Sequence, residues 1–166
     1  MLFRSREAIS EELRDLRTRV EDLETEAVEA FNHHIEALID RLEYDDLDRI
    51  WIERREETVR EGRETVTKGV FDLHVIRQAA DGTVYEDTVD HLSESEREVV
   101  GLVFALAGYL VHDVHEQVPV MVLDSLEAID ADRIASLVAY FEEYVDYLVV
   151  ALLTEDAAAL PADYDR

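Results

Sequence analysis

The sequence contains no cysteine, and this absence excludes two kinds of site at once. Without thiols the chain can form neither disulfide bonds nor zinc sites built on thiolates. Long apolar runs are lacking too, because no run approaches the roughly 18 to 20 residues that a membrane-spanning helix needs. The N-terminal segment also lacks the apolar region of a secretory signal peptide. We therefore expect a soluble, cytoplasmic protein that does not meet a membrane.

Lysine is almost absent, and basic residues as a whole are outnumbered. Lys68 is the only lysine, and 16 Lys plus Arg residues stand against 41 Asp plus Glu residues, which gives a formal net charge of −25. Such a surface repels nucleic acid and anionic membranes at ordinary salt. Two explanations remain open: solvation in a high-salt cytoplasm, where salt screens the carboxylates, or an acidic DNA mimic that binds a basic partner. The dispersal of the acidic residues along the chain favours salt adaptation.

Glycine and proline are scarce, and neither interrupts the first part of the chain. Apolar residues recur there at alternating spacings of four and three, at Ile9, Leu13, Leu16, Val20, Leu23, Ala27 and Ala30. This narrow a/d seam predicts a coiled-coil helix over residues 1–34, whose natural partner is another helix. A plain amphipathic surface helix is the alternative. Beyond Ala30 the apolar face broadens, which predicts that the helix enters a globular body.

Strand signals follow the helix. Residues 50–52, Ile-Trp-Ile, predict a short strand. Residues 71–78 and 83–89 alternate apolar and polar positions on either side of Asp81-Gly82, which supplies residues suited to a tight turn. We therefore expect a β-hairpin in this region.

The rest of the chain predicts alternating helices and strands. Ser93 and Glu96 form a capping box at the start of a long helix that is apolar almost all round and should be deeply buried. Residues 118–124 and 147–153 predict two buried strands, joined by a helix that Asp130 caps. Such a strand–helix–strand unit pairs its strands in parallel through a right-handed crossover. We predict an α/β body of three or four strands over residues 35–160, and a tail at 161–166.

The order of these elements resembles a known family. LSESEREVVGLVFALAGYL (92–110) resembles the signature motif and helix of ABC ATPases. PVMVLDSLEAIDADRI (119–134) resembles their Walker B strand and D-loop, and YLVVALL (147–153) resembles the strand that leads to the switch region. A heptad helix shortly before the signature motif is the layout of SMC and DNA-repair ATPases, whose coiled coil lies between the two halves of the head. The chain thus resembles the C-terminal half of an SMC-type ABC head with a stub of its coiled coil.

Two further segments narrow the resemblance to one branch. FNHHIEALIDRLEYDDLDRIWIER (31–54) and LDSLEAIDADRIASLVAYF (123–141), together with the acidic composition, are similar to the haloarchaeal SMC-related proteins. The resemblance extends from the coiled-coil segment to about residue 160.

The resemblance implies roles for five residues. Ser93 matches the signature serine that contacts the γ-phosphate of ATP held by the opposite head, and Glu96, in the same helical turn, is a second candidate for ATP binding in trans. Asp124 matches the carboxylate that holds Mg²⁺ through its water shell, and Glu127 is a candidate for catalysis from the next turn. Asp130 matches the D-loop aspartate, which acts across the dimer interface. A helix N-terminus with a capping serine is in any case suited to a phosphate group.

Several positions depart from the family pattern. The sequence contains no G-x-x-x-x-G-K-[ST] phosphate-binding loop, so that loop must come from another polypeptide or an upstream region. Ser125 stands where a catalytic glutamate is usual, and Glu94 and Ser95 replace the signature glycines. Residues 154–156, Thr-Glu-Asp, occupy the neighbourhood of the switch histidine. We expect no ATP hydrolysis by the chain alone, and slow hydrolysis or an ATP-dependent clamp in a completed head.

The resemblance implies a half-site of an SMC-like ATPase that maintains chromosomes or repairs DNA. It would join a segment that bears the phosphate-binding loop, form a homodimer through ATP and Mg²⁺, and reach DNA, in the nucleoid, only within the full complex. Two alternatives remain: a degenerate interaction module that recruits a partner through its heptad helix, and the acidic DNA mimic. His112 and His115, beside Asp113 and Glu116, hint at a metal site but lack a clear third ligand.

Overall fold

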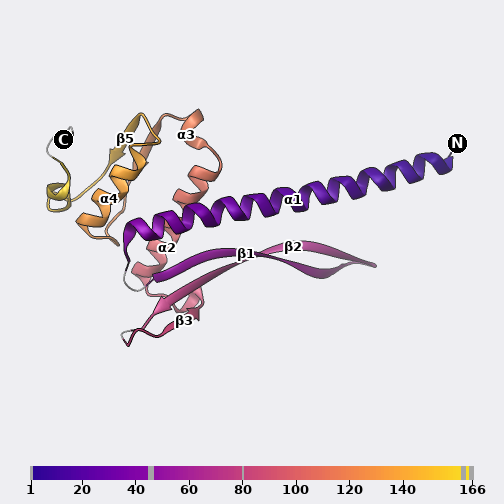
Figure 1. The fold of residues 1–166 in the computed structure, drawn as a ribbon, viewed down its shortest axis with the longest axis horizontal. Helices are drawn as coiled ribbons and strands as arrows, with labels where there is room; N and C mark the ends of the chain where they lie inside the picture. The colour runs from indigo at the N-terminus through magenta and orange to yellow at the C-terminus, as the bar shows by residue number, and fades with distance from the viewer. Residues whose placement is uncertain (1, 45–46, 80, 162–163, 165–166) are drawn as a thin grey trace.

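The computed structural model describes residues 2–44, 47–79, 81–161 and 164 (Figure 1). One long helix, α1 (Leu2–Leu42), opens the chain, and its N-terminal part projects far from the rest of the molecule. The other elements follow in the order β1 (Leu47–Glu61), β2 (Glu64–Gln78), β3 (Val84–Asp87), η1 (Val89–His91), α2 (Glu94–Val111), α3 (Val114–Gln117), β4 (Val120–Leu123), α4 (Ala131–Phe141), β5 (Tyr147–Val150) and η2 (Asp156–Ala159). None of the helices among these residues is long and apolar enough to cross a membrane.

The two parts of α1 differ in burial, as the change in its apolar pattern predicts. Leu16 and Leu23 of the heptad seam are 52% and 56% exposed, whereas Ile35, Leu38 and Leu42 are fully buried. The C-terminal part of α1 therefore belongs to the core, together with residues of β1, β2, α2 and α4. The boundary at residue 34 stays a prediction.

A long antiparallel hairpin of β1 and β2 runs beside α1 (Figure 1). Asn32 of α1 fixes it in place: its side-chain amide donates to the Ile52 carbonyl at 2.8 Å, and its amide oxygen accepts from the Ile52 N–H at 2.7 Å. The guanidinium Nε of Arg54 donates to Glu24 at 2.9 Å further along. These contacts attach the strand pair to the helix.

The predicted hairpin around Asp81-Gly82 is confirmed, because β2 pairs with β3 from Val75↔Asp87 to Gln78↔Val84. The prediction of a short strand at 50–52 is wrong, because β1 spans 15 residues. Its outer part carries Glu, Arg and Thr side chains in a ribbon that is largely exposed, so it lacks the apolar alternation that marks a strand. Gly62, with φ of +64°, forms the turn between β1 and β2.

The predicted helix after Ser93 is confirmed as α2, but its deep burial is wrong. Val99, Val103 and Leu110 are buried, whereas Phe104 on another side is 42% exposed. Phe104 lines an apolar groove of about 760 Å³ between α1, the hairpin and α2. The excess apolar surface of α2 therefore faces an open groove instead of a core.

The predicted parallel strand pair is also confirmed. β4 and β5 pair in parallel from Val120↔Tyr147 to Leu123↔Val150. Their predicted full burial is wrong, because Met121 and Leu123 are buried while Val122 is 66% exposed. The prediction of three or four strands is also wrong for the described residues, which form a three-stranded antiparallel sheet and a separate two-stranded parallel sheet.

The C-terminal segment is irregular. It contains the 3-10 helix η2, Asp156–Ala159. Of the predicted tail at 161–166, only Pro161 and Tyr164 lie within the described residues.

Candidate functional site

The N-terminus of α2 is closed by the predicted capping box. The Ser93 hydroxyl accepts from the Glu96 N–H at 3.3 Å, and the Glu96 carboxylate accepts from the Ser93 N–H at 2.7 Å. Ser93 remains exposed, and its hydroxyl lies 3.3 Å from that of Ser95. The first turn of α2 thus presents a serine to solvent in a backbone conformation that two local hydrogen bonds fix.

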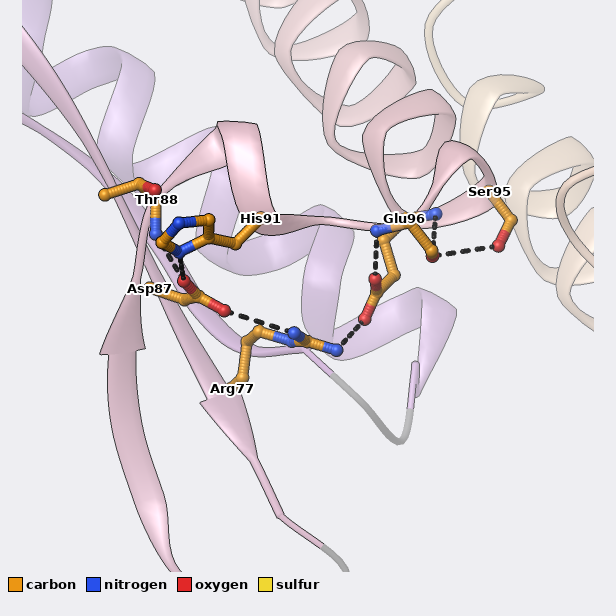
Figure 2. Close-up of polar contacts among 7 residues, drawn as sticks. Arg77, Asp87, Thr88, His91, Ser95 and Glu96 are labelled. Atoms are coloured by element: carbon orange, nitrogen blue, oxygen red, sulfur yellow. Dashed lines mark hydrogen bonds and ion pairs between the residues drawn. The ribbon is translucent and has the colours of Figure 1, made fainter.

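An arginine from the hairpin completes this arrangement. Arg77, near the end of β2, pairs with Glu96 through Nη2 and with Asp87 through Nη1 at 3.1 Å (Figure 2). Asp87 also accepts from the Thr88 N–H at 2.8 Å and lies 2.8 Å from Nδ1 of His91. The start of α2 is therefore connected to both β2 and β3.

The contacts between Arg77, Asp87 and Glu96 favour the charged form of each side chain. Burial alone would raise the pKa of Glu96, but the hydrogen bonds from Ser93 and the charge of Arg77 outweigh it, so the pKa is lowered. The Thr88 N–H, followed by His91, lowers the pKa of Asp87. The hydrogen bond to Asp87 is the largest cause of the raised pKa of Arg77. Charge-assisted hydrogen bonds therefore connect the three side chains at neutral pH.

A second group of residues gathers at the C-terminal ends of β4 and β5. Asp124 follows β4 directly and accepts from the Ser125 N–H at 2.8 Å, and Ser125 has φ of +60°. Asp124, Glu127 and Asp156 line one hollow of about 220 Å³, together with Leu126, Ile134 and residues 151–153. The carboxyl ends of parallel strands are where α/β sheets commonly place ligands.

The acidic residues of this hollow do not form a compact group of metal ligands. Within the described part of the chain, only Asp113, His115 and Glu116 bring three ligand atoms within 4.8 Å of one another. The carboxylate oxygens of Asp124, Glu127 and Asp156 therefore do not all lie that close together. His112 is not part of the group formed by Asp113, His115 and Glu116. The sequence analysis, which paired His112 with His115, therefore did not identify the right set of residues.

Asp130 caps α4, as its place in the sequence predicts. Its carboxylate accepts from the Arg133 N–H at 3.0 Å and also pairs with the Arg133 guanidinium, and the backbone hydrogen bond is the main cause of its lowered pKa. Arg133 also donates to the carbonyls of Leu42 and Glu43, at 2.5 and 2.6 Å. The start of α4 is thereby fastened to the end of α1.

The five predicted residues thus fall into three places. Asp124 and Glu127 share the hollow, Asp130 is held by Arg133, and Ser93 and Glu96 lie together on α2. The sequence analysis missed Arg77 and Arg133. Their partners lie as far as 19 and 91 residues away, and no local pattern signals such contacts.

Comparison with known proteins identifies close homologues. The chain is 61% identical over 150 residues to the Smc-like protein Sph3 of Haloferax volcanii, a match that covers 90% of this chain and 23% of the relative. It is 57% identical over 156 residues to the Smc-like protein Sph2 of Halobacterium salinarum, covering 92% of this chain and 23% of the relative. The chain therefore spans less than a quarter of the length of these relatives. No protein-family model matches it.

Solved structures give a consistent picture of the fold. One, from work on ATP-driven dimerisation and DNA-stimulated activation of SMC ATPases, aligns with a TM-score of 0.51 at 14% identity and covers 82% of this chain and 75% of that one. Another is an Smc head domain with an extended coiled coil, bound to the C-terminal domain of ScpA, from Pyrococcus furiosus. It aligns with a TM-score of 0.56 at 15% identity and covers 93% of this chain and 36% of that one. The chain is thus homologous, over nine-tenths of its length, to part of the haloarchaeal Smc-like proteins, and it has the fold of an SMC head region.

Proposed function

We propose that the chain supplies the signature, Walker B and D-loop side of an SMC-like ATPase head that acts in chromosome maintenance or DNA repair. The observation that carries this proposal is the hollow at the carboxyl ends of β4 and β5, which brings together Asp124, Glu127 and Asp156. In this role Asp124 holds Mg²⁺ through water. Bound Mg²⁺ neutralises charge on the phosphates of ATP. Because Ser125 follows Asp124, Glu127 or Asp156 is left to orient the attacking water.

The exposed face of the parallel sheet supports a second segment beside it. Val122 and Tyr147 are each 66% exposed and Val149 is 55% exposed, although parallel sheets are normally covered on both faces. A segment that carries the phosphate-binding loop, which these 166 residues lack, would cover this face. The completed head would hold ATP on that loop and beside Asp124.

The exposed position of Ser93 supports contact with a second head. A hydroxyl at a helix N-terminus distinguishes a triphosphate from a diphosphate only when the terminal phosphate lies within hydrogen-bond reach. Ser93, the N-cap of α2, is not among the residues that line the Asp124 hollow, which suits a site completed by a second copy. ATP would therefore join two heads into a dimer.

The test is light scattering of the completed head, with the loop-bearing segment supplied as a second polypeptide or a fusion. Mg²⁺-ATP should cause dimerisation of the wild type, and Ser93→Arg should block it while each monomer still binds ATP. Asp124→Ala should instead weaken the Mg²⁺-dependent binding of ATP within one head. Ser10→Arg, on the exposed part of α1, is the control for an added arginine.

If Ser93→Arg dimerises like the wild type, the signature role of Ser93 is wrong. In that case the second candidate function, an interaction module without nucleotide turnover, is favoured. Its support is the row of exposed apolar residues on α1, which needs a helical partner with or without ATP.

A further inference from the structure

We infer that Arg77 is a positioning residue that couples the β1–β2 hairpin to Ser93. This inference rests on the proposed contact between Ser93 and a phosphate. Arg77 touches neither Ser93 nor any nucleotide site directly. It acts through Glu96, whose carboxylate accepts hydrogen bonds from both Arg77 and the Ser93 N–H (Figure 2).

The geometry gives each oxygen of Glu96 a separate task. Oε2 accepts from the Ser93 N–H at 2.7 Å, which sets the direction in which the chain enters α2. Oε1 accepts from Nη2 of Arg77, which belongs to strand β2 of the hairpin. The Ser93 hydroxyl in turn accepts from the Glu96 N–H. A displacement of Arg77 therefore acts on the same carboxylate that orients Ser93.

Shielding from water makes this connection strong. The side chains of Arg77, Asp87 and Glu96 are 22%, 12% and 6% exposed. At such burial the removal of Arg77 leaves Glu96 as a charge without its cationic partner, and this loss weakens its hold on the Ser93 N–H. Asp87 holds the other side of the guanidinium, so Arg77 has little freedom to turn away.

The connection extends beyond the first turn of α2. Arg77 belongs to β2, which pairs along its whole length with β1, and β1 is fastened to α1 by Asn32 and Arg54. A shift of the hairpin along α1 would thus reach Glu96 and Ser93 through one continuous pair of strands. The direction of Ser93 depends in this way on where the hairpin lies.

Amide hydrogen exchange on the chain alone tests the positioning without nucleotide. Arg77→Met should speed exchange of the amides of residues 93–97 about tenfold, since hydrogen bonds to charged groups contribute that much. Glu96→Gln keeps an oxygen for the Ser93 N–H but loses the charge, so it should have a similar effect, and the double variant should add little. Arg77→Lys keeps the charge but cannot hold both carboxylates as a fork, so it should be intermediate.

Arg55→Met is the matched control, because Arg55 pairs with Asp72 and Glu57, which both belong to the same hairpin. It should leave exchange at residues 93–97 unchanged. If Arg77→Met also leaves it unchanged, or if Arg55→Met changes it equally, Arg77 does not position Ser93 and the inference is overturned.

The completed head provides the functional readout. Arg77→Met should raise the ATP concentration for half-maximal dimerisation about tenfold, while the affinity of the monomer for Mg²⁺-ATP stays that of the wild type. A merely structural role would weaken both the ATP-dependent dimerisation and the binding of Mg²⁺-ATP by the monomer. A normal dimerisation curve for Arg77→Met would overturn the coupling. A wild type that fails to dimerise would instead overturn the proposed function, while the exchange data would still decide the positioning.

Discussion

At the scale of single residues, two arginines fasten the starts of the helices that bear the candidate site. Arg77 joins α2 to the hairpin, and Arg133 joins α4 to the end of α1. Each presents several N–H groups in a planar fork, so one side chain can meet partners from two elements. In a protein with 41 acidic residues, each also gives a carboxylate at the candidate site a partner of opposite charge.

Replacement of Arg133 should therefore destabilise the fold. The carbonyls of Leu42 and Glu43 lie at the C-terminal end of α1, where the helix itself offers them no N–H partner. Without the Arg133 guanidinium they lose the hydrogen bonds that it donates to them. We expect Arg133→Ala to lower the free energy of unfolding by about 2 kcal/mol in urea titrations. Arg60→Ala, on the exposed part of the hairpin, should change it by less than about 0.5 kcal/mol. Equal effects of the two variants would show that Arg133 does not fasten the helices.

Residue-level prediction from the sequence succeeds where the interaction is local. Ser93 and Glu96 are three positions apart and form the capping box that this spacing predicts, and Asp130 caps α4 in the same way. Arg77 and Arg133 could not be found, because the register of strands and the packing of helices decide their partners. The catalytic roles of Asp124 and Glu127 stay predictions.

At the scale of elements, β3 is held to the hairpin partly by a histidine. His74 stacks on Trp51, with ring centroids 4.7 Å apart, and its two nitrogens lie 2.5 Å from Glu86 of β3 and 3.2 Å from Glu53 of β1. The hydrogen bond to Glu86 is the main cause of the raised pKa of His74, and it outweighs burial. One imidazole ring thus bridges carboxylates from both neighbouring strands.

The sign of this shift predicts a pH dependence. A pKa raised in the folded state gives stability that is full below the unfolded value of about 6.5 and is lost as pH rises through the folded value. The thermal midpoint of the wild type should exceed that of His74→Gln at pH 6, and the difference should shrink towards pH 9. Thr58→Gln, at an exposed position of β1, should show no such trend. A difference that grows with pH would contradict the bridging role.

The heptad part of α1, unlike its buried C-terminal part, exposes its apolar residues, so these residues add little to the stability of the core. Leu16 and Leu23 are more than half exposed, so their replacement by aspartate should leave the thermal midpoint of the chain nearly unchanged. The same changes should abolish association with a helical partner segment, measured by sedimentation. Arg14→Asp, outside the seam, is the control. Cooperative unfolding caused by both leucine variants would place this part of α1 in the core.

Among the elements, those with a strong period or a local cap were predictable. The parallel pairing of β4 with β5 and the capped start of α2 were predicted correctly, because both segments have strong apolar patterns. The length of β1 was missed, because its outer part is polar on both faces and is a strand only through its pairing with β2. The open faces of α2 and β4 were missed because an apolar pattern predicts that a surface is covered but cannot identify what covers it.

At the scale of the whole molecule, charge is unevenly distributed. Residues 47–78, which form β1 and β2, contain seven basic and seven acidic residues, so the net charge of −25 lies entirely on the other segments. The long hairpin is thus electrically balanced, whereas the helices and the β4–β5 unit repel one another.

Salt should therefore stabilise the chain. Screening shortens the range of carboxylate repulsion, so we expect the thermal midpoint to rise substantially between about 0.1 M and 2 M KCl. Circular dichroism can follow this midpoint, and sucrose at matched viscosity is the control for a general solvent effect. A flat or falling midpoint would remove the salt-adaptation explanation and favour the DNA mimic.

The projecting helix also magnifies small movements. A helix of 41 residues is about 60 Å long, and Glu24, which pairs with Arg54 of β1, is a contact with the body about 33 Å from the far tip. A rotation of about 10° there would sweep the far tip through roughly 6 Å. The opposite end of the same helix is the end to which Arg133 fastens α4. Slight rearrangements beside Asp130 would therefore be converted into displacements the size of a side chain at the distant tip.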